Sequence, residues 1–527
     1  MKNKSIAKND LPSKAGGELT RDTVALAVLS GVLLFLSFPK YSSGWLAWIA
    51  FVPLFFALRK AASIKQGLLL GFIAGMVSYI GIIYWIAFVV VNYGYLPLYL
   101  GIILMLLLAC YLSIYVALFA GGIVYFRGKV ALYAAAPVLW VCFEYGKSIL
   151  LTGFPWENLG YSQYLNIYLI QIADIAGVFG LSFLIVLVNA VIFEVIDKMS
   201  GREYVLAVAV FLILAGTYIY GFYRLDQVNR LMQNAPGMEV SLIQGNIDQS
   251  IKWNEDYQRE TLNIYERLSL RSSPAKGSLI VWPETAAPFR FQDINDLHNQ
   301  ITDLSVTTKS WLLFGSVSSV QKRDGNDYFN SAYLLSPSGE AKGKYDKVHL
   351  VPYGEYVPLR NFFPFVNKLT AGIGDFGAGS GYYPLSLDDK KIGILICYEA
   401  ILSSAARMYK ERSADLLVSI TNDAWFGTTS APFQHFSMAI FRAVETRLYL
   451  VRSANTGITG IIDPTGKTIA KTNIFQEDAL KGYIKFVKIP TFYAAHGDLL
   501  VIVCFMLSIF YFIWSLKGRD RNASRKH

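Results

Sequence analysis

The sequence predicts a multi-pass helical membrane domain that carries one large α/β domain. Of the 527 residues, 54% are hydrophobic and only 16% are charged, and the mean hydropathy is +0.38. These values exclude an ordinary soluble enzyme and are typical of an integral membrane protein. One long stretch of mixed polarity interrupts the apolar segments. We therefore expect a membrane domain over 1–223, an α/β domain over 224–494, and a last span with a basic tail over 495–527.

Apolar stretches long enough, or nearly long enough, for a spanning helix of about 20 residues flank the α/β domain. Seven precede it and an eighth follows it. We expect spans at about 23–39, 44–58, 66–91, 97–126, 130–151, 167–197, 204–223 and 495–516. The second is short, whereas the fourth and sixth are long enough to tilt or break.

Lysine and arginine gather in alternate connections between these stretches, for example at Arg59, Lys60, Arg127, Lys129 and Lys198. Such residues mark cytoplasmic loops, so we expect both termini in the cytoplasm and the α/β domain on the outer side. The formal net charge of +10 mostly reflects this bias. It therefore does not indicate a nucleic-acid partner.

The α/β domain shows short apolar runs that alternate with amphipathic segments. We expect strands at 240–246, 278–282, 311–315, 331–335, 392–397, 416–421 and 449–453. We expect helices at about 254–271, 293–309, 401–413 and 432–448. Nearly continuous apolar strands alternating with helices favour a layered fold whose sheets are covered by helices.

Three residues of this domain suggest acyl transfer. Cys397 ends an apolar strand and is the only cysteine outside the apolar stretches, which hold Cys110, Cys142 and Cys504. Glu284 ends a similar strand, and Lys347 lies in the segment 345–358. A free thiol has a pKa near ~8.5 and needs a base or a cation for activation. Glu284 would move the thiol proton, and Lys347 would stabilise the thiolate and a tetrahedral oxyanion.

Each of the three also has an ordinary structural interpretation. A cysteine at a strand end is often a small buried hydrophobic residue. Glu284 follows Trp282-Pro283 and so fits the capping of a turn, and Lys347 fits a solvated loop. Their occurrence together in one domain favours the catalytic interpretation.

The motifs around these residues resemble a known family. Trp282-Pro-Glu284, the Lys347 segment and Cys397-Tyr-Glu399 match the Glu-Lys-Cys signature of the nitrilase (carbon–nitrogen hydrolase) superfamily. Together with the apolar helices, four further segments resemble the bacterial apolipoprotein N-acyltransferases: Gln244-Gly-Asn-Ile, Lys252-Trp253, residues 351–358 and residues 422–427.

The resemblance implies a nitrilase-like α-β-β-α sandwich on a membrane domain of eight transmembrane helices. It also implies transfer of an acyl chain from a phospholipid donor to the N-terminal amine of a diacylglyceryl-modified apolipoprotein. The expected location is the bacterial cytoplasmic (inner) membrane, with the catalytic domain on the periplasmic side. No cofactor and no metal are expected.

By the same resemblance, four residues support the catalytic three. Glu355 is expected to orient Lys347 or the amine, although a surface ion pair is the alternative. Tyr398 and Glu399 are expected to act as neighbours of the nucleophile, although Glu399 also fits the capping of the following helix. Asn330 is expected to align the site or to make a hydrogen bond at a strand edge.

Four further residues are candidates for contact with lipid. Trp253 and Trp425 carry over from the family, although packing or anchoring at the membrane interface explains many tryptophans. Trp156 lies in the aromatic segment 153–161, which is either part of the lipid access route or an ordinary interfacial loop. Glu144 is charged within or beside a span, as is Lys147.

Other polar residues are expected to be structural. His349 and His435 lack metal-ligand spacing, and Arg442 and Glu445, three apart on a helix, fit an ion pair. Two rival functions remain. A membrane-tethered amide or nitrile hydrolase would use the same three residues, and a lipid transporter would use the domain only for binding.

Overall fold

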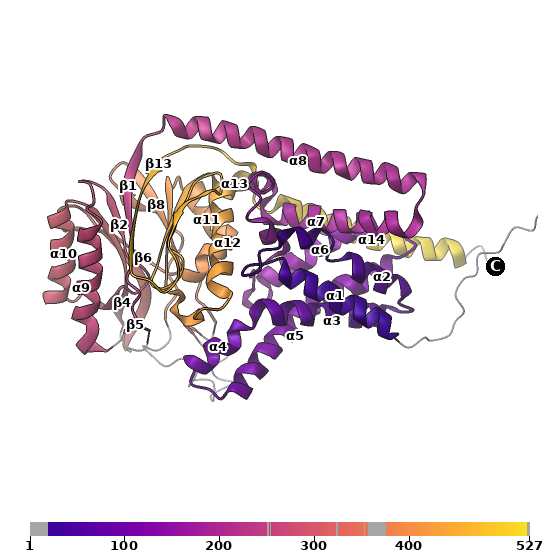
Figure 1. Ribbon diagram of the computed structural model, residues 1–527, viewed down its shortest axis with the longest axis horizontal. Coiled ribbons are helices and arrows are strands. Elements are labelled where there is room, and N and C mark those ends of the chain that lie inside the picture. Colours follow the sequence, from indigo (N-terminus) through magenta and orange to yellow (C-terminus); the bar gives the residue numbers. More distant parts are fainter. Residues whose placement is uncertain are drawn as a thin grey trace, which may run out of the picture.

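The computed structural model describes residues 19–249, 252, 254–322, 325–352, 354–356 and 376–523. A helical domain and an α/β domain lie side by side along the long axis of the molecule (Figure 1). The helical domain contains α1 (Arg21–Leu36), α2 (Val52–Lys60), α3 (Ile64–Ile83), α4 (Trp85–Asn92), α5 (Leu98–Phe126), α6 (Leu132–Ile149), α7 (Ala173–Lys198), α8 (Gly201–Gln233) and α14 (Leu499–Ala523).

Six helical segments in the described part of the chain are long and apolar enough to cross a membrane. They contain α3, α5, α6, α7, α8 and α14. The first two expected spans correspond to α1, with 16 residues, and α2, with 9. At 1.5 Å per residue, α1 is about 24 Å long, below the ~30 Å of a hydrocarbon core. The count of eight spans therefore stays a prediction.

Two expected segments have different bounds in the structure. The span expected at 66–91 is divided at Tyr84 into α3 and α4. The domain boundary expected at 223 falls inside α8, whose 33 residues extend about 50 Å. This helix runs along the membrane domain and reaches the α/β domain, where the first strand begins at Gly237 (Figure 1).

The described part of the α/β domain contains two sheets. The first is seven-stranded and has the order β13-β1-β2-β4-β5-β6, with β3 paired to β4. Its strands are β1 (Gly237–Gln244), β2 (Leu279–Val281), β3 (Ala287–Arg290), β4 (Trp311–Lys322), β5 (Gly325–Leu335), β6 (Ala341–Asp346) and β13 (Asp478–Lys485). Strands β1, β2 and β4 are parallel to one another, and β5 and β6 continue the sheet as antiparallel strands.

The second sheet is six-stranded and has the order β12-β11-β10-β9-β8-β7. Its strands are β7 (Leu385–Leu387), β8 (Lys390–Ile396), β9 (Leu416–Thr421), β10 (Tyr449–Ala454), β11 (Gly460–Ile462) and β12 (Thr468–Lys471). Strands β8, β9 and β10 are parallel and nearly fully buried, as their continuous apolar sequences predict.

Helices cover the outer faces of both sheets, so the domain is an α-β-β-α sandwich (Figure 1). Helices α9 (Glu255–Arg271) and α10 (Asp296–Thr308) lie on the first sheet, and α11 (Ser403–Glu411) and α12 (Ala431–Thr446) lie on the second. All four expected helices are therefore present. Helix α12 also contacts α7, which explains why every residue of α12 except Phe433 is buried.

Buried polar contacts join the two domains through α12. The Gln434 side chain accepts hydrogen bonds from the indoles of Trp156 (2.8 Å) and Trp85 (3.2 Å). At the other end of α12, the Arg447 guanidinium pairs with Asp174 of α7 at 2.8 Å. These side chains lie out of water, so leaving any partner unpaired would be costly. The α/β domain is consequently held in a fixed position on the helical domain.

Candidate active site

The three expected catalytic residues each follow the end of a strand. Glu284 comes shortly after β2, Lys347 directly after β6, and Cys397 directly after β8. Cys397 has a φ of +54°, a left-handed conformation that few non-glycine residues adopt. This backbone bend begins a short 3₁₀ helix, Cys397–Ile401, and directs the chain away from the strand. Strain of this kind is common at functional sites.

Glu284 is buried and its two carboxylate oxygens have separate partners. Oε1 accepts a hydrogen bond from Asn330 Nδ2 at 2.7 Å, and Oε2 accepts one from the backbone N–H of Asn422 at 2.8 Å. The Lys347 ammonium lies 3.9 Å from Oε1. Burial raises the pKa of Glu284, whereas the Lys347 charge opposes that shift. A carboxyl group with a raised pKa is suited to exchange protons near neutral pH.

Lys347 is also buried, with only 1% of its side chain exposed, and it lies between two carboxylates. Its Nζ is 2.8 Å from Glu355 Oε2, the closer of the two acidic partners. Burial lowers the pKa of Lys347, but the charges of Glu355, Cys397 and Glu284 outweigh burial and the net pKa is raised. The lysine is therefore a permanent cation within the site.

The charges of Glu284 and Lys347 both affect the pKa of the Cys397 thiol. Burial raises the pKa of its thiol, the Glu284 carboxylate raises it further, and the Lys347 ammonium opposes both. Cys397 is consequently a thiol at rest, and a role as nucleophile would require a base to take its proton. The mutual effects on pKa show that these three groups lie within electrostatic reach of one another.

Glu355 and Asn330 belong to the same polar cluster. Asn330 Nδ2 donates to Glu284 Oε1 and also to Glu355 Oε1, at 2.9 Å. The Asn330 carbonyl additionally accepts the backbone N–H of Lys347 at 2.9 Å. Asn330 thereby fixes both carboxylates and the start of the lysine segment. Its position supports alignment of the site and is not limited to a strand-edge bond.

Glu399 does not face this cluster but joins the lysine and cysteine segments. Oε1 accepts the backbone N–H groups of Val348 (2.8 Å) and His349 (3.0 Å), and Oε2 accepts that of Ile396 (2.8 Å). The Tyr345 hydroxyl donates to both oxygens. Glu399 therefore fixes the segment after Lys347 relative to the segment before Cys397.

Aromatic rings surround the backbone next to Cys397. The Tyr398 ring stacks on His349, with centroids 5.6 Å apart, and on Trp156, with centroids 6.5 Å apart. Trp156 is 2% exposed, and its ring also lies against that of His435, with centroids 5.8 Å apart. These contacts place Trp156, from the helical domain, against the segment that carries Cys397.

The other tentative lipid contacts have different environments. Trp425 is 36% exposed and packs edge-on against Tyr93, with centroids 5.0 Å apart, where the segment after α4 meets the α/β domain. Glu144 is buried and accepts the backbone N–H of Leu159 at 2.6 Å. It thus holds the segment that carries Trp156. Trp253 lies outside the described residues.

Sequence reasoning missed a buried network behind the nucleophile. His435 Nε2 donates to the Cys397 carbonyl at 3.1 Å, and Asp423 lies 2.9 Å from Nδ1. Arg452 contacts both Asp423 and His435, at 2.8 and 3.0 Å. His435 was expected to be structural, and the structure assigns it the specific task of holding the Cys397 backbone. Only its helical position next to apolar residues was visible in the sequence.

A second buried lysine, Lys252, belongs to the Lys252-Trp253 motif, but no role was assigned to it from the sequence. Lys252 donates from Nζ to the backbone carbonyl of Glu284 at 3.1 Å, and burial lowers its pKa to about 8. The expected Arg442–Glu445 ion pair is confirmed at 3.0 Å. Among the residues that the structure describes, no group of three or more potential ligands could hold a metal ion.

We predict that Glu355→Gln shifts the acidic limb of the kcat/KM–pH profile to lower pH, by about one unit. The Glu355 charge raises the pKa of Glu284, so its removal allows Glu284 to ionise at lower pH. The profile should be measured as acyl transfer on purified protein. Glu340→Gln, at an exposed ion pair with Lys342, is the matched control and should leave the limb unchanged. A limb that moves upward would contradict this arrangement of charges.

The chain is similar to known families and structures. Residues 30–191 match the family of the apolipoprotein N-acyltransferase N-terminal domain, and residues 239–490 match the carbon-nitrogen hydrolase family. A solved structure of Saccharomyces cerevisiae Nit3, a member of branch 10 of the nitrilase superfamily, is similar over 47% of this chain and 90% of its own. Its TM-score is 0.38 and its sequence identity 17%.

Two curated relatives match nearly the whole chain. The apolipoprotein N-acyltransferase of Geobacter metallireducens is 46% identical and covers 92% of this chain and 94% of its own length. That of Pasteurella multocida is 30% identical and covers 90% of this chain and 92% of its own. The chain therefore belongs to the apolipoprotein N-acyltransferase family.

Proposed function

We propose that this protein transfers a fatty acyl chain from a membrane phospholipid, through a thioester on Cys397, to the N-terminal amine of a diacylglyceryl-modified apolipoprotein. This reaction is the last step of lipoprotein maturation. The observation that carries the proposal is the meeting of Glu284, Lys347 and Cys397 in one buried site, on a domain fixed to apolar helices. The family to which the chain belongs supports the same reaction.

In the first half-reaction, Glu284 takes the proton of the Cys397 thiol as sulfur attacks the ester carbonyl of the phospholipid. A C–S bond forms, and Lys347 stabilises the oxyanion of the tetrahedral intermediate. Collapse of the intermediate breaks the ester C–O bond. Glu284 then gives its proton to the departing lysophospholipid oxygen, which leaves the thioester on the enzyme.

In the second half-reaction, the neutral amine of the acceptor attacks the thioester. The C–N bond forms and the C–S bond breaks, and the proton lost by nitrogen passes through Glu284 to the Cys397 sulfur. The permanent positive charge of Lys347 stabilises this second oxyanion as it did the first. One site thus serves both substrates in turn, and the donor product leaves before the acceptor binds.

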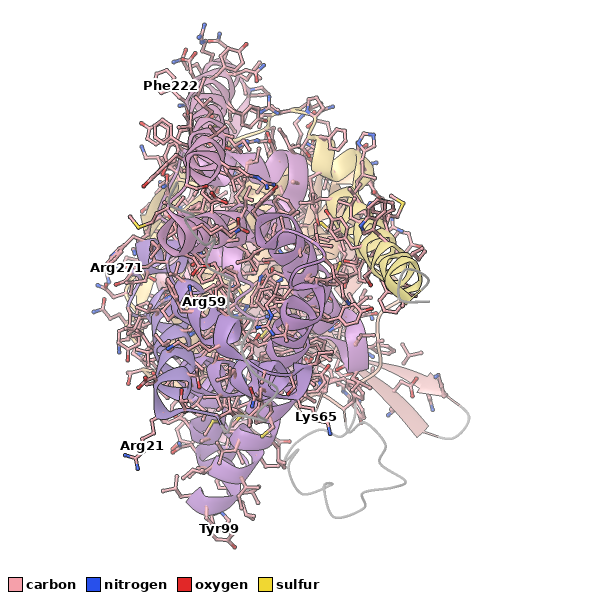
Figure 2. All side chains as sticks on the ribbon, turned by 90° about the vertical axis from the view of Figure 1, so that its right-hand side faces the viewer. Arg21, Arg59, Lys65, Tyr99, Phe222 and Arg271 are labelled. Atoms are coloured by element: carbon pink, nitrogen blue, oxygen red, sulfur yellow. The ribbon has the colours of Figure 1, made fainter. Side chains whose placement is uncertain are left out.

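Lipid is proposed to reach Cys397 beside α4 and the start of α5. Trp425 and Tyr93 meet there, and Tyr95, Leu98 and Tyr99 of the same hairpin are strongly exposed. Tyr99 lies at the tip of this projection (Figure 2). Exposed tyrosine and leucine side chains are suited to the membrane interface. The hairpin of α4 and α5 would therefore connect the membrane surface with the side of the α/β domain that carries Trp425.

We place the protein in the bacterial inner membrane, with cytoplasmic termini and a periplasmic catalytic domain, as the lysine and arginine distribution favours. An impermeant maleimide applied to intact spheroplasts should label Asp389→Cys, an exposed site on the catalytic domain. It should label Lys60→Cys, exposed at the opposite end, only after lysis. The reverse pattern would overturn this orientation.

Pre-steady-state kinetics tests the proposed reaction. Enzyme mixed with phospholipid alone should release about one equivalent of lysophospholipid in a burst and then stall, because water does not reach the thioester. The same sample should gain one acyl mass at Cys397. Continued release of free fatty acid would favour a membrane-tethered amide or nitrile hydrolase. Release that requires the acceptor would rule out the ping-pong order.

A further inference from the structure

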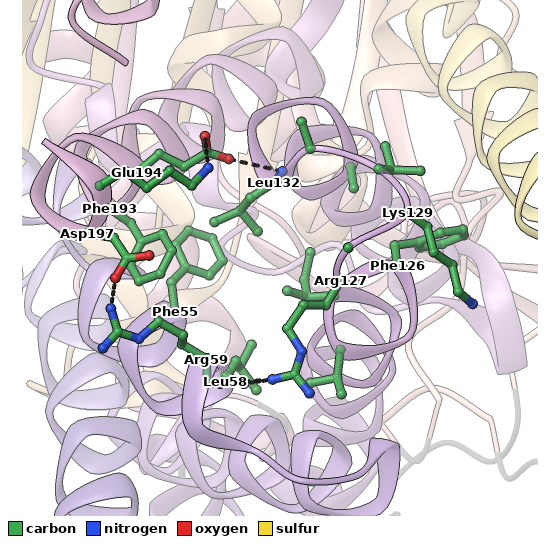
Figure 3. Close-up of a pocket in the computed structure, with 17 residues that line it drawn as sticks. Phe55, Leu58, Arg59, Phe126, Arg127, Lys129, Leu132, Phe193, Glu194 and Asp197 are labelled. Carbon is green, nitrogen blue, oxygen red and sulfur yellow. Dashed lines mark hydrogen bonds and ion pairs between the residues drawn. The ribbon is translucent and has the colours of Figure 1, made fainter. Parts of the chain in front are cut away.

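A cavity of about 440 Å³ opens at the end of the helical domain that faces away from the α/β domain. Its walls come from the end of α2, the turn between α5 and α6, and the end of α7 (Figure 3). Its floor is apolar and includes the buried side chains of Phe55, Leu58, Phe126 and Phe193. Figure 2 views this end of the molecule and labels Arg59 at its centre.

Charged side chains form the rim of the cavity. Two of its cations are balanced by carboxylates, because Arg59 pairs with Asp197 and Lys198 lies 3.0 Å from Glu194 (Figure 3). The rim also contains Arg127 and Lys129, which brings the lining to four cations and two carboxylates. The cavity therefore carries an excess of two positive charges.

Arg127 and Lys129 supply this excess. The Arg127 guanidinium donates to the backbone carbonyls of Leu58 (3.0 Å), Arg59 (2.9 Å) and Ala61 (2.7 Å). Because these acceptors are neutral, they do not balance the arginine charge. Lys129 Nζ lies 3.7 Å from the centroid of the Tyr125 ring. Neither cation is in an ion pair with any described residue. Both side chains are exposed, and both residues belong to the lining of the cavity.

We propose that this cavity binds an anionic phospholipid, with its phosphate against Arg127 and Lys129 and an acyl chain along the phenylalanine and leucine floor. The charge excess fits an anionic head group, and the volume is within the usual range for a ligand site. Basic pockets between membrane helices are a known means of holding such lipids. A free phosphate ion would balance the excess charge of Arg127 and Lys129 but would leave the apolar floor of the cavity in contact with water.

This site is separate from the catalytic centre and independent of the proposed reaction. Helix α5 has 29 residues, about 44 Å, and its two ends lie near the catalytic domain and at the cavity. A lipid held here contacts α2, α5, α6 and α7 together. It would therefore stabilise the packing of the helical domain and would not donate its acyl chain to Cys397.

The test uses full-length protein in neutral detergent, with dioleoyl phosphatidylglycerol as the probe and dioleoyl phosphatidylcholine and inorganic phosphate as comparisons. Native mass spectrometry measures retained lipid, and thermal unfolding measures stabilisation. Phosphatidylglycerol should be retained and should raise the unfolding midpoint more than either comparison. The double variant Arg127→Gln/Lys129→Gln should bind it about 25-fold more weakly, from about fivefold for each charge removed.

Two controls keep the result decisive. Lys60→Gln/Lys65→Gln removes the same charge from exposed positions at this end that do not line the cavity, and should retain wild-type affinity. Lys129→Gln alone preserves the Arg127 contacts with α2 and should lose about fivefold. Equal losses in the control and test double variants would overturn the site. Equal stabilisation by phosphatidylcholine or by inorganic phosphate would overturn its assignment to an anionic lipid.

Discussion

Replacement of Cys397 by serine is expected to leave a folded, membrane-inserted protein whose turnover falls by about 10⁴–10⁶-fold. The serine hydroxyl is close in size to the thiol, so the strained backbone and the contact with His435 should persist. A hydroxyl is a much weaker acid than a thiol, and Glu284 is a poor base for it. Turnover should be measured as lysophospholipid release and as acyl mass on the protein.

Cys110→Ser is the matched control for this variant. Cys110 lies in α5 of the helical domain, and its replacement should preserve both the burst and the acyl adduct. If Cys397→Ser retained near-wild-type turnover with an unchanged unfolding profile, the thioester mechanism would be wrong. A Cys397→Ser protein that unfolds at a much lower temperature would instead show that the thiol supports the local structure.

The strands that the sequence predicts share one physical property. β8, β9 and β10 lie inside a sheet between two covered faces, so their apolar sequences are nearly continuous. The strands that were missed include β6 and β13, which lie at the two edges of the first sheet and contain lysines at alternating or exposed positions. Edge strands are often charged because charge discourages pairing with other chains. Such sequences resemble loops until the pairing is known.

In the candidate site, too, features within one segment could be predicted, whereas contacts between segments far apart in the sequence could not. Glu284 and Cys397 could be proposed because each follows an apolar run and belongs to a recognisable motif. Lys347 follows the missed strand β6 and could be proposed only from its motif. The task of Glu399 was not predictable, since its carboxylate binds backbone groups of residues 348 and 349, far away in the sequence. His435 was likewise expected to be structural only because it lacks metal-ligand spacing. Contacts between segments distant in sequence decide both roles.

Replacement of Lys347 by methionine is expected to lower acyl-enzyme formation by about 10²–10³-fold, the usual effect of removing one donor to an oxyanion. Methionine retains much of the length of lysine but carries no charge. In the unmodified protein, the Lys347 ammonium lowers the pKa of Glu284 and Glu355 raises it. The pKa of Glu284 should therefore rise further when the ammonium is removed. The acidic limb of the pH profile should therefore move upward, opposite to its shift in Glu355→Gln.

The opposite directions of these shifts separate an electrostatic role of Lys347 from simple loss of structure. Breaking a buried ion pair costs about 3–5 kcal/mol of stability, so rates must be expressed per folded molecule from a parallel unfolding measurement. Lys344→Met removes the ammonium of a more exposed lysine on β6 that pairs with Asp346, and should leave the profile unchanged. If Lys347→Met lost activity without any upward shift of the limb, Lys347 would not control the ionisation of Glu284. In that case, Glu284 would require a different neighbour to keep it ionised during attack by Cys397.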